Sequence, residues 1–341
     1  MKTNISLSTL SEIKESISKI DTDLLLIVVD SRVWQLYGKK LQESLSEDKT
    51  ILLYKALEGE NAKTIREIEN GLEFFLEKGI HRKAHLIAIG GGATSDFGGF
   101  LASTLIRGID WSVVPTTLLS MVDASIGGKT GVNSSFGKNL IGTFHLPKNV
   151  WINPEFLETL ESSELESGKG EILKYGFLSK EVDKLLKNKA SLREIIAKCA
   201  EVKEKIVIED FKEGGRRISL NLGHTFGHAL ERIYDLPHGV SVFWGMALIF
   251  KLFDGNKHLE VLRNYEKSID AHFGNPPWLN KTFPVDKIME LVTKDKKKKT
   301  SNSVQIVKIK EIGAFETEEL GFNKIESLLK EKSDELRSFN F

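Results

Sequence analysis

Short apolar runs alternate with helical patterns in the first half of the chain. Four runs have the length and the composition of buried strands, namely 24–29, 51–54, 85–89 and 111–114. Between the second and the third run, apolar residues recur at helical spacing from Ile65 to Leu76. Strands that alternate with helices favour a parallel sheet with right-handed crossovers. We therefore expect a Rossmann-like α/β domain in this half.

The pattern changes near residue 155 and is mostly helical beyond it. The segments 191–209 and 323–338 are examples of such helical patterns. We predict a nucleotide-binding α/β domain over residues 1–158 and a mainly α-helical domain over residues 159–341. In the simplest arrangement of two such domains, the active site lies in the cleft between them.

Composition and charge narrow the class of protein without identifying it. Of the 341 residues, 48 are basic and 48 are acidic, so the net charge is zero and nothing points to binding of nucleic acid or membrane. The single cysteine, Cys199, excludes a disulfide framework and favours a cytoplasmic protein. The first residues lack the apolar segment of a signal peptide, and no apolar run approaches the roughly 20 residues of a transmembrane helix.

Three of the 8 histidines fall close together, between positions 224 and 238. His224 and His228 are four positions apart, so on a helix they share one face, and His238 follows in a turn marked by proline and glycine. With one cysteine in the chain, imidazole is the expected ligand for a divalent metal ion. By itself the pattern fits a metal site that is open to substrate or a helix with structural histidines.

A glycine-rich loop follows the predicted strand that ends at Ile89. Its sequence is GGGATSD, residues 90–96, and a helical stretch, 97–106, comes next. Glycines in front of a helix let backbone N–H groups approach a pyrophosphate, although this loop is not the common dinucleotide fingerprint and also fits a tight turn. Asp30, at the end of the first predicted strand, is placed either to bind ribose hydroxyls or to form a turn.

Lysines and glycines gather in short loops of the middle segment. The sequences GGK at 127–129 and GKN at 137–139 are typical of an anion cradle or of surface turns. Glu171 and Lys174, three positions apart on a predicted helix, form either an exposed ion pair worth at most about 0.5 kcal/mol or a metal ligand beside a substrate-facing cation. The lysine run at 296–299 is usual for a solvated loop.

Eleven motifs, taken in order, resemble those of 3-dehydroquinate synthases. They are GGGxxxDxxGF, RG, PTTLL, D, GGK, GKN, SGxxExxKYG, R, LNLGHTFGHA, PHG and DKK, and the match runs from about Asp30 to Gly313. The resemblance implies a lyase of the shikimate pathway, and so of aromatic amino acid and chorismate biosynthesis. Such an enzyme converts 3-deoxy-D-arabino-heptulosonate 7-phosphate to 3-dehydroquinate and phosphate. The resemblance also implies that NAD and one divalent metal ion (zinc or cobalt) are cofactors and that the protein is a homodimer.

The same resemblance implies the order of chemical steps. The substrate is oxidised at C5 by NAD, which acidifies the neighbouring proton, and phosphate leaves. The hydride then returns, the ring opens, and an intramolecular aldol reaction closes the carbocycle. NAD is therefore a catalytic cofactor that is not consumed. The substrate phosphate takes its own proton during elimination, so we assign no dedicated base.

Site residues carry over from the resemblance position by position. The metal ligands fall on Glu171, His224 and His238, and His228 becomes a hydrogen-bonding partner of the substrate. NAD contacts fall on Asp30, Glu60, Lys63, Gly91, Gly92, Asp96, Thr116, Thr117, Asp123, Lys129, Lys138, Thr159 and Leu160. Substrate contacts fall on Lys129, Asn139, Lys174, Lys203, Arg217, Asn221, His228, Lys296 and Lys297. Arg107 matches an arginine that reaches the phosphate in the neighbouring subunit, although by sequence alone it also fits a cation at a helix C-terminus.

Other hypotheses stay open at this point. Another sugar-phosphate cyclase would use the same cofactors on a substrate without the carboxylate, but residues 137–139, Asn221 with His228, and the lysine pair 296–297 favour dehydroquinate synthase. A metal-dependent polyol dehydrogenase would share the glycine loop and consume NAD, while a non-catalytic role is disfavoured by the three presumed ligands. Departures from the family pattern leave rate and cofactor affinity open, and they fall on Asn153, Phe211, Arg216, Val240 and Ser241.

Overall fold

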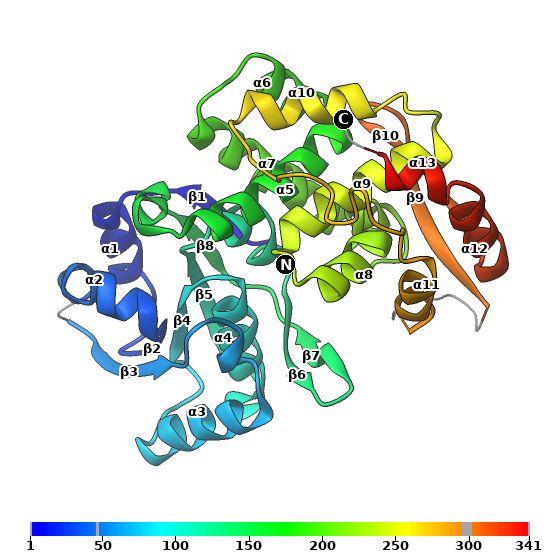
Figure 1. Ribbon diagram of the computed structural model, residues 1–341. Helices are drawn as coiled ribbons and strands as arrows, with labels where there is room; N and C mark the ends of the chain where they lie inside the picture. The colour runs from blue at the N-terminus through cyan, green and yellow to red at the C-terminus, as the bar shows by residue number, and fades with distance from the viewer. Residues whose placement is uncertain (1, 46–47, 295–301, 340–341) are drawn as a thin grey trace. The chain divides into compact units, whose positions relative to one another are not determined.

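The computed structural model describes residues 2–45, 48–294 and 302–339, and the chain divides into two compact units (Figure 1). Unit 1 comprises residues 1–160 and unit 2 comprises residues 161–341. Unit 1 is an α/β structure and unit 2 is mainly helical, which confirms the predicted fold class. Lys296 and Lys297 lie outside the described residues.

A six-stranded sheet with the order β1-β8-β5-β4-β2-β3 forms the centre of unit 1. Its strands are β1 (Asn4–Leu7), β2 (Leu24–Asp30), β3 (Thr50–Ala56), β4 (His85–Gly90), β5 (Asp110–Pro115) and β8 (Asn149–Ile152). All neighbouring strands are parallel. The four predicted strands correspond to β2, β3, β4 and β5. The edge strand β1 and its neighbour β8 are four residues long, too short to give a clear apolar run.

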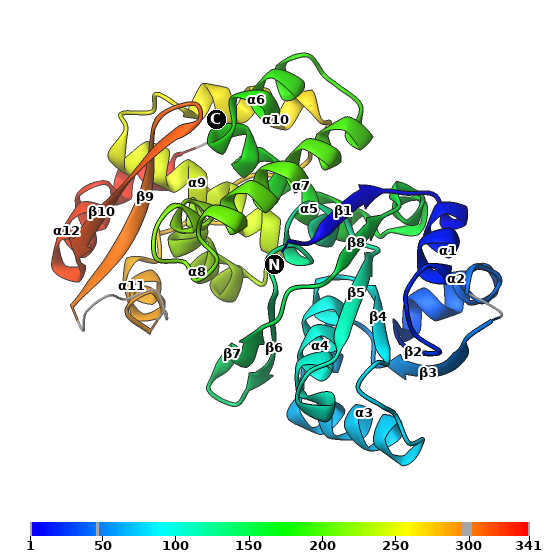
Figure 2. The ribbon, with the colours of Figure 1, turned by 180° about the vertical axis from the view of Figure 1, so that it is seen from behind.

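Helices cover both faces of this sheet, which explains why β2 and β4 are buried along their whole length. The helices are α1 (Leu10–Ser18), α2 (Ser31–Ser44), α3 (Ile65–Glu77) and α4 (Gly92–Thr104). α1 contacts α2, α3 contacts α4, and the two pairs lie on opposite faces (Figures 1 and 2). An antiparallel hairpin of β6 (Lys129–Ser134) and β7 (Gly137–Phe144) packs against α4 through β6.

The glycine-rich loop is shorter than the sequence suggested. α4 begins at Gly92, five positions before the predicted start at residue 97, and Gly91 is its N-cap. A Cβ atom on Gly90 would lie 2.5 Å from Thr94 Oγ1 and 2.6 Å from Thr94 Cβ. Only glycine permits this sharp passage from β4 into α4, so the helix starts inside the motif itself.

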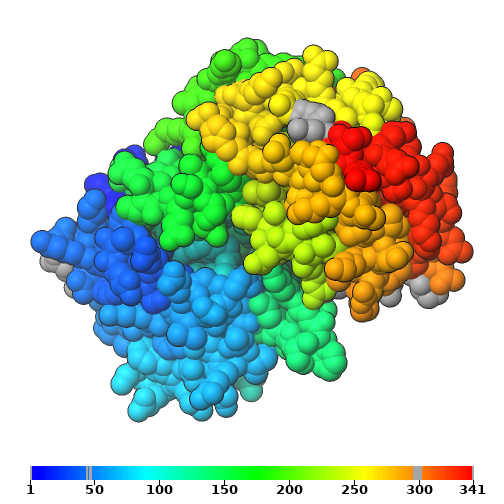
Figure 3. All heavy atoms as spheres, viewed as in Figure 1, coloured from blue at the N-terminus to red at the C-terminus, as the bar shows by residue number. Residues whose placement is uncertain are grey.

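Unit 2 is assembled around α9, which is buried on nearly all sides. Its helices are α5 (Ser162–Leu178), α6 (Lys180–Lys187), α7 (Leu192–Glu209), α8 (His224–Tyr234), α9 (His238–Phe253), α10 (Leu259–Ser268), α11 (Val285–Lys294), α12 (Phe322–Glu331) and α13 (Ser333–Arg337). α5 and α8 pack directly on α9. α10 buries Leu259, Leu262 and Tyr265, and its other face lies on the surface, in yellow-orange in Figure 3.

Two predictions for the second half need correction. The predicted helix 323–338 is interrupted at Lys332, between α12 and α13. An antiparallel hairpin of β9 (Ser303–Glu311) and β10 (Ala314–Gly321) precedes α12, in a part of the mainly helical second half for which no strand was predicted. Lysines of β9 pair with glutamates of β10 across this hairpin, for example Lys308 with Glu318 at 2.8 Å. Its strands therefore lack the continuous apolar runs that marked β2 to β5.

A buried histidine in β4 should make unfolding sensitive to mild acid. Burial lowers the pKa of His85 to about 4, and its Nε2 lies 2.9 Å from Ser112 Oγ. In the unfolded chain the pKa returns to about 6.5, so the unfolded state takes up a proton first as the pH falls. The free energy of unfolding should therefore drop by up to about 3 kcal/mol between pH 6.5 and pH 4 on account of this one group.

Urea denaturation at pH 7 and at pH 4.5 checks this expectation. His85→Gln keeps a polar side chain without a titrating ring, so its loss of stability between the two pH values should be smaller by about 2–3 kcal/mol. His81→Gln, at a partly exposed position of unit 1, is the control and should follow the parent protein more closely than His85→Gln does. Equal losses in the parent and in His85→Gln would contradict the assignment.

Candidate functional site

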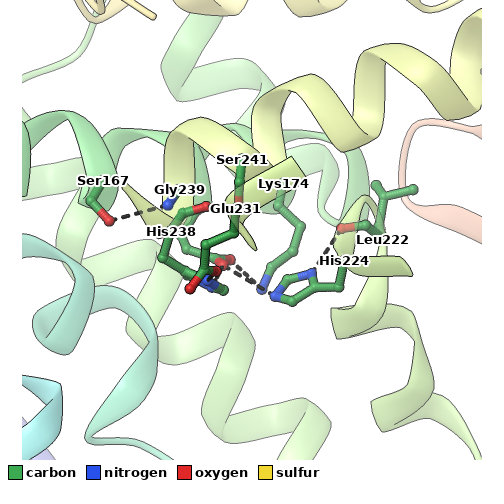
Figure 4. A network of polar contacts seen from close by, with 9 residues as sticks. Ser167, Lys174, Leu222, His224, Glu231, His238, Gly239 and Ser241 are labelled. Carbon is green, nitrogen blue, oxygen red and sulfur yellow. Dashed lines mark hydrogen bonds and ion pairs between the residues drawn. The ribbon is translucent and has the colours of Figure 1, made fainter. Parts of the chain in front are cut away.

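Three side chains that are suited to metal binding meet in unit 2. Glu171, His224 and His238 come from α5, α8 and α9, and one ligand atom of each lies within 4.8 Å of the others. Glu171 Oε1 is 3.3 Å from His224 Nε2 and 3.1 Å from His238 Nε2. Figure 4 shows the side chains of Lys174, His224 and His238 converging from separate elements. Residues that are distant in sequence thus form one cluster.

The close approach of α5 and α9 explains why Glu171 and His238 meet. A Cβ atom on Gly170 would lie 2.0 Å from the carbonyl oxygen of Gly239, and one on Gly239 would lie 1.7 Å from that of Ser167. The two glycines therefore allow the helix backbones to touch. Gly239 N–H also donates to Ser167 Oγ at 3.1 Å (Figure 4).

His238 is the first residue of α9, with Pro237 as the N-cap. The prediction that His238 lies in a turn is therefore wrong, because the proline before it caps the start of a helix. His224 is likewise the first residue of α8, after Gly223 in the left-handed region at φ 81°. Both histidines thus project from helix starts, where the chain changes direction sharply.

The partners of the second ring nitrogen fix how each histidine can act. His224 Nδ1 lies 3.1 Å from the carbonyl oxygen of Leu222, which can only accept, so this nitrogen carries the proton. His238 Nδ1 lies 3.0 Å from Glu231 Oε2 and donates to that carboxylate (Figure 4). In both rings Nε2 is the atom left for a metal ion, and the outer hydrogen bond holds the ring in place.

The charges of the cluster favour a cation at its centre. Burial raises the pKa of Glu171, but Lys174, His224 and His238 outweigh it and hold this pKa well below its usual range. Burial lowers the pKa of His238, yet the hydrogen bonds to Glu171 and Glu231 raise it to about 9. The ionised Glu171 thus draws a proton onto His238, and a divalent ion would replace that proton.

One carboxylate and two imidazoles are a donor set that suits zinc or cobalt. Three protein ligands are also the number found in catalytic sites, which keep one position for water or substrate. The residues present therefore fit a divalent metal ion. His228 lies beside this set, since its ring centroid is 5.4 Å from that of His224 and 6.0 Å from that of His238.

Three further candidate residues of unit 2 are buried cations. Lys174, Lys203 and Arg217 are 1%, 6% and 1% exposed. They come from α5, α7 and the short helix η5 (Arg216–Asn221), and α7 contacts both α5 and η5. Lys174 forms an ion pair with Glu171 inside the protein, so the interpretation of these two as an exposed pair is wrong. Asn221 is the last residue of η5.

Several candidate residues of unit 1 share one edge of the sheet. β2, β4 and β5 are parallel neighbours, so Asp30, Gly91 and Thr116, which end or follow these strands, lie at the same edge. The N–H group of Thr116 donates to the carbonyl of Gly90 at 2.9 Å, which ties two of these strand ends together. Thr117 follows Thr116, and Asp123 lies in the next short helix, η3 (Ser120–Ala124).

Asp30 has a structural role in addition to any binding role. Its Oδ1 accepts from the N–H groups of Arg32 at 2.8 Å and Val33 at 3.4 Å, which caps α2. Its Oδ2 accepts from Gly59 N–H at 2.9 Å and from Thr94 Oγ1 at 3.4 Å. This carboxylate therefore stabilises the turn after β2, as one of the two interpretations of the sequence expected, and also joins it to two neighbouring segments.

A polar network connects the helix η1 (Gly59–Ala62) to α4 and to the hairpin β6–β7. Lys63 Nζ, 3% exposed, lies 2.5 Å from Asp96 Oδ2 and 3.9 Å from Glu60 Oε1. Asn133 Nδ2 donates to Glu60 Oε2 at 2.9 Å, and Asn133 Oδ1 accepts from Asn139 N–H at the same distance. The network brings Glu60, Lys63 and Asp96 together and holds the β7 segment that contains Lys138 and Asn139.

The remaining candidates of unit 1 lie in separate places. Lys129 begins β6 and is exposed. Thr159 ends the short helix η4 (Pro154–Thr159), where its hydroxyl lies 2.8 Å from that of Tyr37, and Leu160 follows. Arg107 lies beyond the last turn of α4, in η2 (Leu105–Arg107), with φ 69°. Arg107 thus follows the C-terminal end of α4, as the sequence indicated.

Glu231, the partner of His238, was not among the residues predicted from the sequence. A signal was available, because Glu231 lies seven positions after His224 and three after His228. Residues at this spacing share one face of a helix. Ser167 and the carbonyl of Leu222 carried no such signal, since their roles depend on how separate elements meet. Within the ranges that the structure describes, no helix has both the length and the apolar character to cross a membrane.

Family models and curated proteins agree on one family. Residues 53–167 match the model of the 3-dehydroquinate synthase N-terminal domain, and residues 168–298 match that of the C-terminal domain. The 3-dehydroquinate synthase of Streptococcus thermophilus (strain CNRZ 1066) is 37% identical over 308 residues, which are 84% of each chain. That of Pyrococcus furiosus is 40% identical over 281 residues, 78% of this chain and 82% of the relative.

Solved structures of similar fold include two cyclases and a dehydrogenase. A 2-deoxy-scyllo-inosose synthase complexed with carbaglucose-6-phosphate, NAD+ and Co2+ has a TM-score of 0.82 at 21% identity and covers 96% of both chains. The 2-epi-5-epi-valiolone synthase from Streptomyces hygroscopicus, with NAD+ and Zn2+ bound, reaches 0.81 at 24% over 98% of both chains. An iron-containing alcohol dehydrogenase reaches 0.61 at 14% over 98% of both. At these identities the likeness shows a shared fold.

The family follows from the sequence matches. The two family models join at residues 167 and 168 and together span residues 53–298, most of the chain. The relatives at 37% and 40% identity each align with more than three quarters of the chain. The chain therefore belongs to the 3-dehydroquinate synthase family.

Proposed function

We propose that the protein converts 3-deoxy-D-arabino-heptulosonate 7-phosphate to 3-dehydroquinate and phosphate, with NAD and one divalent metal ion as cofactors. The observation that carries this proposal is the cluster of Glu171, His224 and His238 in a chain of this family. The relatives named 3-dehydroquinate synthase at 37% and 40% identity support it. The other cyclases and the alcohol dehydrogenase share only the fold, so those activities have weaker support.

Glu171, His224 and His238 hold the metal ion in this proposal, each histidine through Nε2. When bound, the metal acidifies the substrate hydroxyl that is oxidised, and NAD accepts the hydride and later returns it. Glu231 and the Leu222 carbonyl keep the two rings oriented, as outer partners of metal ligands commonly do.

The buried cations bind the two anionic groups of the substrate. Lys174, Lys203 and Arg217 are shielded from water, and charge-assisted hydrogen bonds to a carboxylate or a phosphate are strong in such a place. Asn221 and His228 donate to or accept from the substrate hydroxyls. We also assign to substrate binding the four residues Lys129, Asn139, Lys296 and Lys297.

The strand ends of unit 1 bind NAD in this proposal. Gly91 and Gly92 lie at the start of α4, where N–H groups and the helix dipole attract a pyrophosphate. Thr116 and Thr117 lie at the same sheet edge, and Lys63, beside Asp96, supplies a nearby buried cation. The other residues that the resemblance assigns to NAD complete the proposed site. A cytoplasmic location and the boundary of the NAD-binding domain at residue 158 stay predictions.

Single substitutions of the two histidines of α8 should show that only one of them is a metal ligand. His224→Ala should lose the metal ion and the activity, because Glu171 and His238 alone make an incomplete set. His228→Ala is the matched control on the same helix and should keep the metal while the KM for the heptulosonate phosphate rises. Metal content after dialysis, measured by atomic emission, reads out binding without reference to turnover. Metal retained at parental level in His224→Ala would refute the ligand assignment.

Turnover with a trace of NAD should reveal a cyclase. One equivalent of NAD per active site should support many cycles, since the hydride returns to the same substrate molecule. Phosphate release and 3-dehydroquinate would be followed together in a reaction with the heptulosonate phosphate, Zn2+ or Co2+, and NAD. NADH that accumulates in step with substrate consumption would favour the polyol dehydrogenase and reject the proposed function.

We further propose a homodimer in which Arg107 of each subunit reaches the substrate phosphate of the other. Arg107→Ala should then weaken substrate binding by about 10- to 150-fold, the value of a lost charge-assisted bond. Arg107→Ala subunits mixed with His224→Ala subunits should recover activity well above either variant alone. In a mixed dimer, the Arg107→Ala subunit keeps an intact metal cluster, and the His224→Ala subunit supplies the arginine that reaches its site. Subunit exchange without recovered activity would place the action of Arg107 within its own chain or nowhere.

A further inference from the structure

One carboxylate organises the loop that connects α7 to η5. Asp210 Oδ1 accepts from Gly214 N–H at 2.9 Å, and Oδ2 accepts from Gly215 N–H at 2.7 Å and from Arg217 N–H at 3.0 Å. Although burial raises the pKa of Asp210, the three N–H donors and the charge of Arg217 hold it below its usual range. The side chain is therefore ionised at neutral pH and accepts hydrogen bonds on both oxygens.

The same loop holds the guanidinium of Arg217. Its Nη1 donates to the carbonyl oxygen of Phe211 at 2.8 Å, and its Nε lies 3.6 Å from Glu213 Oε1. Asp210 thus fixes the backbone of Arg217, while the residue next to Asp210 fixes the side chain. Because the arginine fork is planar and this side chain is 1% exposed, its direction follows from the shape of the loop.

Stability of α7 does not explain an aspartate at this position. Asp210 is the C-cap of α7, where the negative end of the helix dipole disfavours a carboxylate. The two adjacent arginines of the loop also differ in exposure and in direction. Arg216 is 47% exposed and pairs with Glu209 at 2.7 Å, whereas Arg217 is directed inward. The hydrogen bonds of Asp210 therefore hold the loop in the conformation that directs Arg217 inward.

We infer that Asp210 is a positioning residue, which sets the affinity for the anionic substrate by holding Arg217 in the direction in which it binds a carboxylate or a phosphate. The inference rests on the proposed function of Arg217. Asp210 acts through Arg217, so its removal should have no effect once the arginine itself is gone.

A double-mutant cycle on the KM for the heptulosonate phosphate tests this inference. Arg217→Ala should raise the KM about 10- to 150-fold, the equivalent of one charge-assisted hydrogen bond. Asp210→Ala should raise it by a smaller factor, about 5- to 50-fold, and Asp210→Asn, with one acceptor oxygen, should fall between Asp210→Ala and the parent. The double variant Asp210→Ala, Arg217→Ala should match Arg217→Ala alone, since coupled residues are not additive.

Two control variants separate positioning from general damage. Arg216→Ala removes the neighbouring exposed cation of the same loop, and Ser191→Ala removes the N-cap of α7 at its other end. Both should keep the parental KM, even if Ser191→Ala unfolds at lower urea concentration. Metal content and the KM for NAD should stay at the parental level in every variant, and Asp210→Asn remains informative if Asp210→Ala does not fold.

The outcomes distinguish this inference from the proposed function. A parental KM in Arg217→Ala would overturn the substrate role of Arg217 and the inference with it. A raised KM in Arg217→Ala, together with a parental KM in the Asp210 variants or with additive effects in the double variant, would overturn the inference alone. Loss of metal in the Asp210 variants would do the same, because it would mark a structural defect in unit 2.

Discussion

The side chain of Glu171 is fully buried, and an ionised carboxylate in that position requires positive charge around it. Lys174 and the two histidines are the groups that supply this charge in unit 2. Their arrangement depends on the contact of α5 with α9, where Gly170 and Gly239 bring the backbones together. A larger residue at either glycine would separate the helices and leave the carboxylate partly unpaired, so packing and electrostatics constrain each other here.

The fold class and most of the candidate site were predictable from sequence for different reasons. The strands β2, β4 and β5 are almost wholly buried and therefore appear in the sequence as continuous apolar runs. By contrast, β9 and β10 carry lysines and glutamates that pair across the hairpin, and these two strands were missed. The cluster of Glu171, His224 and His238 came from a family resemblance, since spacing alone left its histidines open to a structural role. Helical spacing could have placed Glu231 on the same face as His224 and His228. Its contact with His238 depends on where α9 begins, which the spacing does not show.

Local backbone chemistry was harder to predict than the elements themselves. The glycine loop at 90–92 was expected to precede a helix from residue 97, and Pro237 to mark a turn. In the structure, one helix begins at Gly92 and another at His238. Asp30 and Asp210 show why such details escape a pattern. Each is an aspartate at the end of an element that accepts several backbone N–H groups from segments met only in three dimensions. Their partners are backbone groups, which leave no signature in the sequence.

The buried cations of unit 2 are difficult to explain by stability alone. Lys174, Lys203 and Arg217 lie almost wholly out of water, and the desolvation of a charge costs several kcal/mol before its partners compensate. Replacing buried ionic groups by apolar side chains of similar volume is often neutral or stabilising in proteins. Lys174 balances the charge of Glu171, but the presence of three buried cations in unit 2 is weak evidence for a purely stabilising role. In the proposed function, a dianionic substrate is the partner for which such charges are arranged in advance, because donors already fixed in a water-poor site need no reorganisation when it binds.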